Sequence, residues 1–281
     1  MVDRNRVLDF VTYAVLLIGV AIVALPLWVA VAASTQTLDQ VQAAPMSLLP
    51  GSSAVSNYAE ALATGAGSSQ AAVRGMLFNS LVVALGIAIG KIAISLLSAF
   101  ALVYFRFPFR TLCFWLIFVT LMLPVEVRIM PTYEVMASLG LINTYAGLTL
   151  PLIASATATF LFRQFFMTVP DELAEAAKLD GAGPMRFFWN ILVPLSRTNM
   201  AALFVILFIY GWNQYLWPLL MTTDESMYTV VIGIKRMITL GDAATEWQLV
   251  MASAMLAMLP PVLVVVLMQK WFVKGLVEAD K

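Results

Sequence analysis

Six apolar stretches of this chain are each long enough to cross the hydrocarbon core of a membrane as a helix. Crossing about 30 Å of hydrocarbon takes about 20 helical residues, and the stretches cover residues 10–33, 76–105, 111–135, 145–166, 199–220 and 248–273. Charged residues make up only 11% of the chain, whereas soluble domains carry about 25%. The sequence therefore predicts an all-α integral membrane protein with six transmembrane helices, in a single transmembrane domain over residues 1–281.

The ionisable composition argues against several classes of protein. Lys and Arg number 16 and Asp and Glu also number 16, so the chain has no basic excess with which to bind nucleic acid. It contains no His and one Cys, Cys113. We therefore predict no catalytic residue, no metal site and no nucleic-acid partner. A self-contained secondary transporter would show two inverted halves with matching broken segments, and the sequence shows no such pair.

Lys and Arg are concentrated on one side of the predicted topology. With the N-terminus inside the cell, most of the 16 basic residues fall in cytoplasmic segments. Cytoplasmic loops are enriched in Lys and Arg, so both termini of this multi-pass protein are predicted to be cytoplasmic. The same orientation places residues 168–197, between the fourth and fifth spans, inside the cell.

Residues 168–197 form a polar, alanine-rich segment between apolar spans. Thr168 and Asp171 have the spacing of a capping box, which predicts the start of a helix. Gly181 is expected to end that helix, and Pro194 is expected to end a second one. A helix of this kind could bind a soluble partner, or it could pack on the protein's own spans.

The spacing within this segment resembles the EAA signature of ABC importer permeases. The family's pattern is E-A-A-x3-G-x9-I-x-L-P, and Val193 stands here where the family usually has Leu. The matching positions are Glu175, Ala176, Ala177, Gly181, Ile191 and Pro194. The stretches LSAFALVYFRFPFR and FIYGWNQYLWPLL also look like the carbohydrate-type subfamily, so the resemblance covers nearly the whole chain. It implies the type I ABC importer permease fold, with a cytoplasmic coupling helix.

The resemblance also implies a function. The chain would be a permease subunit of an ATP-driven importer in the bacterial cytoplasmic (inner) membrane. Its partners would be a sister permease, two ATP-binding subunits and an extracytoplasmic solute-binding protein. ATP and Mg would be bound by the partner ATPase, and this chain would hold no cofactor. Glu175, Ala177, Asp180 and Gly181 would belong to the coupling helix. The implied cargo is sn-glycerol-3-phosphate or a glycerophosphodiester, with a sugar or oligosaccharide as the alternative.

Polar groups inside the predicted spans are candidates for the substrate path. A charge at the centre of a membrane helix costs about 2.5–3.5 kcal/mol, so such groups suggest function. Pro124 and Pro131 bracket Glu126 and Arg128, which predicts a break in the third span that lines a cavity. Arg128 could bind phosphate oxygens with its guanidinium fork. Alternatively, Glu126 and Arg128 pair with each other or lie at the outer headgroups.

A second candidate group lies near the end of the fifth span. It consists of Trp212, Asn213, Gln214 and Tyr215. Aromatic rings and amides suit polyols or sugars, because CH groups stack on rings while hydroxyls bind amides. The alternative is an aromatic belt at the membrane surface. Lys91, in the second span, is expected to snorkel, to face a partner subunit or to meet a carboxylate rather than to contact the cargo.

Overall fold

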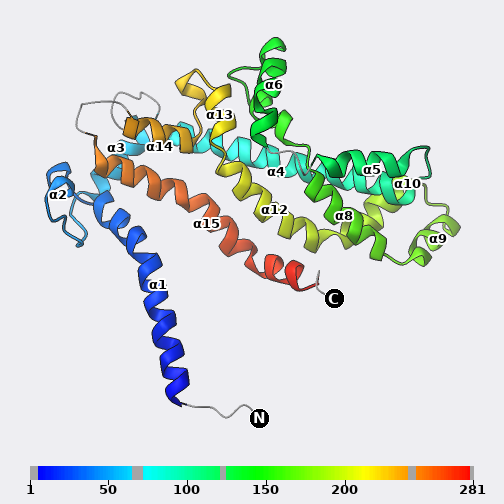
Figure 1. Ribbon diagram of the computed structural model, residues 1–281, viewed down its shortest axis with the longest axis horizontal. Coiled ribbons are helices and arrows are strands. Elements are labelled where there is room, and N and C mark those ends of the chain that lie inside the picture. The colour runs from blue at the N-terminus through cyan, green and yellow to red at the C-terminus, as the bar shows by residue number, and fades with distance from the viewer. Residues whose placement is uncertain (1–5, 65–71, 121–124, 240–244, 279–281) are drawn as a thin grey trace. The chain divides into compact units, whose positions relative to one another are not determined.

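The computed structural model describes residues 6–64, 72–120, 125–239 and 245–278, and every regular element within these ranges is a helix (Figure 1). The chain divides into two compact units, which are described separately. One unit comprises residues 1–75 and 233–259, and the other comprises residues 76–232 and 260–281. The single domain over residues 1–281 stays a prediction.

The first unit is organised by hydrogen bonds that fold the chain back on the end of its first long helix. Its helices include α1 (Arg6–Ser34), α2 (Leu38–Gln42), α3 (Ala54–Thr64) and the first part of α15 (Trp247–Glu278). Asn57 is buried and donates from Nδ2 to the backbone oxygens of Ser34 and Gln36, at 2.9 and 2.8 Å. Gln36 Nε2 donates to the backbone oxygens of Ser47 and Leu49, both at 2.8 Å. The segment after α1 is therefore an ordered structure held by amide side chains.

The second unit is built along α4 (Val73–Tyr104), a helix of 32 residues without proline. Figure 1 shows α4, in cyan, as one unbroken helix. The elements that follow are α5 (Arg110–Val119), α6 (Val125–Ser138), α7 (Tyr145–Thr149), η1 (Leu150–Leu152), α8 (Ala156–Thr168), α9 (Asp171–Leu179), α10 (Pro184–Phe187), η2 (Phe188–Leu192), α11 (Val193–Leu195), α12 (Arg197–Trp212), α13 (Leu216–Met221) and η3 (Glu225–Met227). The next helix, α14 (Val230–Thr239), belongs to the first unit from residue 233 onward. At 1.5 Å per residue, α4 extends about 48 Å.

Small residues allow other helices to approach α4 closely. A Cβ atom on Gly211 of α12 would lie 2.9 Å from the Cα of Ala84. A Cβ atom on Gly90 would lie 2.5 Å from the side chain of Ile153, in the turn between η1 and α8. Side chains at either glycine would push the helices apart, so these positions fix the close packing around α4.

Three helices in the described ranges are long and apolar enough to cross a membrane. They are Asp9–Ser34, Val73–Tyr104 and Trp247–Trp271. Two bent pairs also pass the test together: Tyr145–Leu152 with Ala156–Thr168, at 49°, and Pro184–Leu195 with Arg197–Trp212, at 71°. Judged by helix length and composition, the described residues contain three spans, or five if each bent pair counts as one span. The structure thus supports an all-helical membrane protein, but with fewer than the six predicted spans.

The predicted third span, residues 111–135, is divided between α5 and α6, and neither part is long enough to cross alone. The break was predicted between Pro124 and Pro131. That position is wrong, because α6 begins at Val125 and contains Pro131. Membrane helices tolerate an internal proline, since the freed backbone carbonyl can find another partner. Pro124 lies outside the described residues.

The predicted fourth and fifth spans are also interrupted by proline. Pro151 lies in the short 3-10 turn η1, after which Ser155 caps the start of α8 by accepting a hydrogen bond from the Ala158 N–H at 3.3 Å. The fifth span was predicted to continue to residue 220, but α12 ends at Trp212. Pro218 lies in the first turn of the helix that follows, where proline is tolerated because its missing N–H would have no partner within the helix. That helix is α13, which starts at Leu216.

Candidate functional site: the coupling segment and the polar break

The coupling segment, residues 171–195, begins with α9. The predicted capping box is wrong. Thr168 is the last residue of α8, and its Oγ1 donates to the backbone oxygen of Phe165 at 2.7 Å. Pro170 is the N-cap of α9 and provides no side-chain cap. Because a proline keeps the preceding residue extended, Val169 separates the two helices and Thr168 cannot cap the second. Asp171 and Glu172 instead place negative charge in the first turn, where it favours the helix dipole.

The other end of α9 is closed by backbone hydrogen bonds, and the prediction that Gly181 ends the helix is confirmed. Gly181 has φ +69°, in the left-handed region that glycine adopts without steric cost. Its N–H donates to the Lys178 oxygen at 3.0 Å, and the Ala182 N–H donates to the Ala177 oxygen at 2.8 Å. This pair of bonds is a Schellman motif. The chain then restarts as a helix at Pro184, so α9 ends in a fixed turn.

The two faces of α9 differ in exposure. Ala177 is only 6% exposed, and it lines a cavity of about 250 Å³ together with Tyr104 and Phe187. The opposite side leaves Leu179 89% exposed. Glu175, Ala176, Asp180 and Gly181 are exposed as well. The sequence analysis did not predict an exposed Leu179. A large apolar residue two positions before the glycine that ends a helix could have indicated it. The exposed surface of α9 is available to a partner.

An aromatic cluster attaches the coupling segment to the end of α4. The ring centroids of Phe187 and Tyr104 lie 5.2 Å apart, and those of Phe188 and Phe100 lie 4.9 Å apart. Tyr104 also contacts Phe166 of α8, at 6.2 Å between centroids. Aromatic pairs at such distances stabilise contacts beyond their area of burial. A displacement of the coupling segment would therefore be felt directly by α4 and α8.

Ile191 and Pro194 lie in the continuation of α10, and both are half-buried. Residues 188–192 are π-helical, and Pro194 lies inside the helix that continues to Leu195. The prediction that Pro194 ends the second helix is therefore wrong. A wider π turn accommodates the proline, which cannot donate to the carbonyl four residues earlier. The chain turns only at Ser196, whose N–H donates to the Leu192 oxygen at 2.9 Å.

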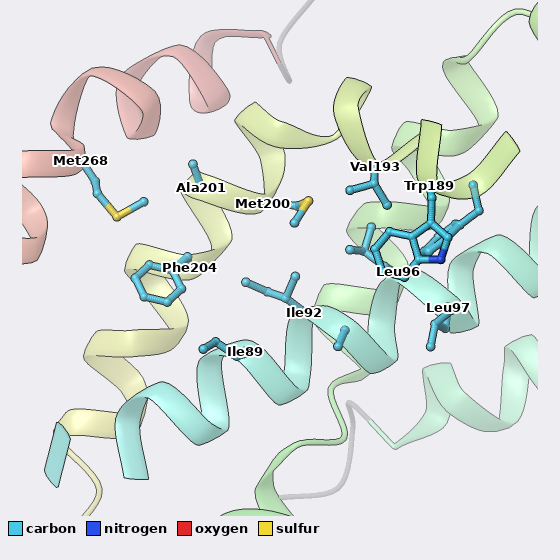
Figure 2. Close-up of a pocket in the computed structure, with 12 residues that line it drawn as sticks. Ile89, Ile92, Leu96, Leu97, Trp189, Val193, Met200, Ala201, Phe204 and Met268 are labelled. Atoms are coloured by element: carbon cyan, nitrogen blue, oxygen red, sulfur yellow. The ribbon is translucent and has the colours of Figure 1, made fainter. Parts of the chain in front are cut away.

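A cavity of about 410 Å³ lies next to the coupling segment, and Figure 2 shows its lining. Ile89 and Leu96 of α4 face this space, as do Trp189 of η2 and Phe204 of α12. All the lining side chains are apolar except for the indole nitrogen of Trp189. Apart from this N–H group, the side chains of the lining offer no hydrogen-bond partners to a polar cargo.

The polar break, residues 213–215, lies between α12 and α13. Asn213, Gln214 and Tyr215 line a cavity of about 240 Å³ together with Tyr210 and Ile129. Gln214 Nε2 donates to the Tyr210 oxygen at 3.1 Å, which leaves its amide oxygen available. The structure thus brings three of the four predicted residues to one cavity.

The other predicted members of the substrate path lie elsewhere. Trp212 is buried and its ring stacks on Phe208, with centroids 5.8 Å apart. Arg128 is exposed on α6, next to the cavity-lining Ile129. The side chain of Glu126 lies outside the described residues, so its pairing with Arg128 stays a prediction. Among the described residues, no group of three or more acidic or cysteine side chains could hold a metal ion.

Lys91 is a member of this region that the sequence did not assign to the path. It is only 8% exposed and lies at mid-length on α4, so the prediction that it snorkels is wrong. Its Nζ lies 4.0 Å from the centroid of the Tyr210 ring, and Tyr210 lines the cavity at the polar break. In the sequence, Lys91 is notable as a single cation within an apolar span. Its aromatic partner could not be recognised without the fold.

Hydrogen bonds from distant residues hold the chain that follows the polar break. Asn79 of α4 donates from Nδ2 to the oxygens of Ser226 and Tyr228, at 2.8 and 3.0 Å, and its Oδ1 accepts from Tyr145 Oη at 2.6 Å. Asn143 accepts the N–H groups of Thr223 and Asp224, at 2.7 and 3.1 Å. Nothing in the local sequence of the two asparagines identifies their partners.

Comparison with known proteins identifies the family. Residues 91–278 match the family described as "binding-protein-dependent transport system inner membrane component". The chain belongs to this family. It is therefore a multi-pass permease of the inner membrane, a component of a binding-protein-dependent ABC transporter, and a transport subunit rather than an enzyme.

Several relatives align with this chain over its whole length. The chain is 60% identical over 282 residues to the "sn-glycerol-3-phosphate transport system permease protein UgpE" of Agrobacterium fabrum, with 100% of both chains covered. It is 58% identical to the proteins of the same name from Brucella melitensis and Pectobacterium atrosepticum, again over 100% of each chain.

A solved structure supports the fold. It is the crystal structure of a bacterial ABC transporter involved in the import of the acidic polysaccharide alginate. The match has a TM-score of 0.83 and 20% identity, and it covers 97% of this chain and 99% of that chain. The backbones of the two chains thus have the same fold, which confirms the expected permease fold.

Proposed function

We propose that this family member carries sn-glycerol-3-phosphate, and related glycerophosphodiesters, through the inner membrane. The observation that carries the proposal is the 58–60% identity over the whole chain to permeases named for this cargo. The cavity at the polar break, of about 240 Å³, is compatible with a small cargo. Drug-sized ligands occupy pockets of about 300–1,000 Å³, so an oligosaccharide is the less suitable candidate.

The topology that we propose has six spans, with both termini in the cytoplasm. The distribution of Lys and Arg supports this orientation. The third span would be formed by α5 and α6 together. In the assembled importer the chain would pair with a sister permease, two ATP-binding subunits and an extracytoplasmic solute-binding protein. The ATPases would bind ATP and Mg, and this chain would transmit their motion.

The exposed side of α9 is the proposed docking surface for an ATP-binding subunit. Glu175, Ala176 and Asp180 present small and acidic groups there, and Leu179 adds an apolar side chain that is almost fully exposed. The Schellman turn at Gly181 keeps the end of this helix in one conformation. A short rigid helix of this kind would transmit a displacement rather than absorb it.

Motion would pass from α9 to the spans through the aromatic cluster. Ala177 faces the cluster, and Phe187 packs directly on Tyr104 at the end of α4. Ile191 and Pro194 belong to the helix that joins the segment to α12. Closure of the ATPases on nucleotide would thus tilt α4, α8 and α12, and alternate the access of the path to the two sides.

Arg128, Asn213, Gln214 and Tyr215 are the residues that we assign to the path. The amides and the tyrosine would bind glycerol hydroxyls, and the arginine would bind phosphate oxygens. Glu126 would lie beside Arg128 on α6. Trp212 would support the break from within the packed helices, because its ring is buried.

Reconstitution of the complex with its own binding protein tests the cargo. We expect sn-glycerol-3-phosphate and glycerophosphocholine to stimulate ATP hydrolysis and to be imported, whereas maltose does neither. Stimulation by maltose alone would contradict the proposed cargo while leaving the family assignment intact.

A charge reversal tests the docking surface. We expect Glu175→Lys to abolish ATP-driven import, because the side chain is exposed and the reversal would oppose docking. Glu60→Lys is the control: it makes the same change at an exposed position on α3, outside the coupling segment. Import by Glu175→Lys at the rate of the control would refute the assignment of α9.

A further inference from the structure

Lys91 is a buried cation whose position the proposed path does not yet explain. It lies at mid-length on α4, and the structure records no carboxylate paired with it in the part of the chain that it describes. Burying an unpaired charge at this depth is costly, and an apolar residue would avoid the cost. The contact with the Tyr210 ring offsets part of the cost, since the face of an aromatic ring attracts a cation.

The surroundings of Lys91 are suited to an anion. Arg128 immediately precedes Ile129, which lines the cavity at the polar break. Tyr210, which holds the Lys91 ammonium over its ring, also lines the cavity at the polar break. Asn213 and Gln214 line the same cavity and provide hydrogen-bonding amides. The cavity thus has two amides in its lining and a cation over one of its rings, and a bound anion would give Lys91 the partner that it lacks among the described residues.

We propose that Lys91 binds the phosphate of the cargo as it passes the polar break, and that Tyr210 positions the Lys91 ammonium for this contact. This inference rests on the proposed function and adds to Arg128 a second residue that recognises the charged end of the cargo. The glycerol end would be left to the amides of the break. Lys91 lies thirteen residues before Tyr104 on the same helix, about 20 Å along it, so one rigid element joins this site to the coupling segment.

The charge of the cargo gives a specific expectation. A phosphate monoester carries nearly two negative charges at pH 7.5, because its second pKa is about 6, whereas a phosphodiester carries one. Coulomb energy is proportional to the charge, so removing the cation should cost the monoester about twice as much free energy as the diester. A loss of about threefold for the diester then corresponds to a loss of about tenfold for the monoester.

The experiment compares two cargoes in the complete reconstituted complex with its binding protein. The variants are Lys91→Met and Lys91→Arg, and the readout is the ratio of the import rates of sn-glycerol-3-phosphate and glycerophosphoglycerol, a diester whose second alcohol carries no charge. A variant that folds or assembles poorly imports both cargoes more slowly by the same factor, so the ratio does not change for that reason. We expect Lys91→Met to lower import of the monoester by about tenfold and that of the diester by about threefold, and Lys91→Arg to keep the wild-type ratio.

Substitutions of Tyr210 test its positioning role. Tyr210→Phe keeps the ring face and should keep the ratio, whereas Tyr210→Leu should shift the ratio in the direction of Lys91→Met. An equal loss of both cargoes in Lys91→Met, or no loss of either, would overturn the inference, because a purely structural lysine does not distinguish them. Failure of the wild-type complex to import either phosphate ester would instead refute the proposed function itself.

Discussion

The coupling segment and the chain around the polar break are both interrupted helices, but different forces hold their interruptions. At the end of α9, the closing hydrogen bonds join backbone groups of residues within five positions of one another. After the polar break, the chain is held by Asn79 and Asn143, which lie 147 and 80 residues from the groups that they bind. One interruption is encoded locally and the other by tertiary contacts.

This difference matches the roles that we assign to the two regions. A docking helix must keep its conformation while a partner displaces it. A turn closed by its own backbone hydrogen bonds keeps its conformation even when the spans move. A substrate path must change between two conformations, and contacts between distant elements can be exchanged when those elements move. The difference is open to test by substitutions in each region.

We expect the largest loss of stability from Phe187→Ala, in the cluster that attaches the coupling segment to α4. Phe187 is buried against Tyr104, and replacing a buried Phe with Ala costs about 3–5 kcal/mol. The midpoint of thermal unfolding of the detergent-solubilised complex measures this effect. Met185→Ala, on the exposed side of the same helix, is the control and should change the midpoint little. Equal midpoints for the two variants would mean that the cluster does not hold the segment.

The second largest loss should come from Asn79→Ala, near the start of α4. Asn79 is 4% exposed and makes three side-chain hydrogen bonds. At about 1 kcal/mol each, their loss costs about 3 kcal/mol. Tyr145→Phe removes one of the three and should cost about a third as much. If the two variants had the same unfolding midpoint, the asparagine would not be the residue that holds this loop.

The predictions from sequence succeeded where the determinants are local. Gly181 could be recognised as a helix terminator because the left-handed conformation at a helix end favours glycine. The EAA spacing located α9 and its neighbours, and the length of the apolar runs located α1, α4 and α15 to within a few residues. The capping box failed even so, because Pro170 took the N-cap position and separated Thr168 from the helix that follows.

The predictions failed where the determinants are distant. Hydropathy gives the length of an apolar run, but it does not show that α12 stops at Trp212 or that Pro131 lies within α6. The pairing of Lys91 with Tyr210 joins residues more than a hundred positions apart, and only the packing of α4 against α12 brings them together. For the path, the sequence identified the residue types and the fold identified the neighbours.

Gly181→Ala should have a smaller effect, confined to the coupling segment. A Cβ atom at this position would meet no neighbour within 4 Å, so the cost arises from the left-handed backbone alone and is about 1–2 kcal/mol. Gly183→Ala is the matched control, because that position is equally open but has an ordinary extended backbone. Hydrogen exchange at the Ala182 amide should increase in the first variant and not in the second. Faster exchange in both would show that open space, rather than backbone conformation, sets the stability of the turn.

The smallest effect should be a dependence on pH that is confined to the chain after the polar break. The Ser226 N–H donates to Asp224 Oδ1 at 2.9 Å, and this bond lowers the pKa of the exposed Asp224 carboxyl. Because the folded pKa lies below the unfolded value of about 4, the stabilisation is complete above that value and is lost as the pH falls through the folded pKa. The difference in unfolding midpoint between the wild type and Asp224→Asn should thus be constant from pH 7 to pH 5 and shrink at lower pH. The Schellman turn at Gly181 is closed by backbone groups that do not titrate, so a shrinking difference between the wild type and Gly181→Ala over the same range would contradict the contrast between the two regions.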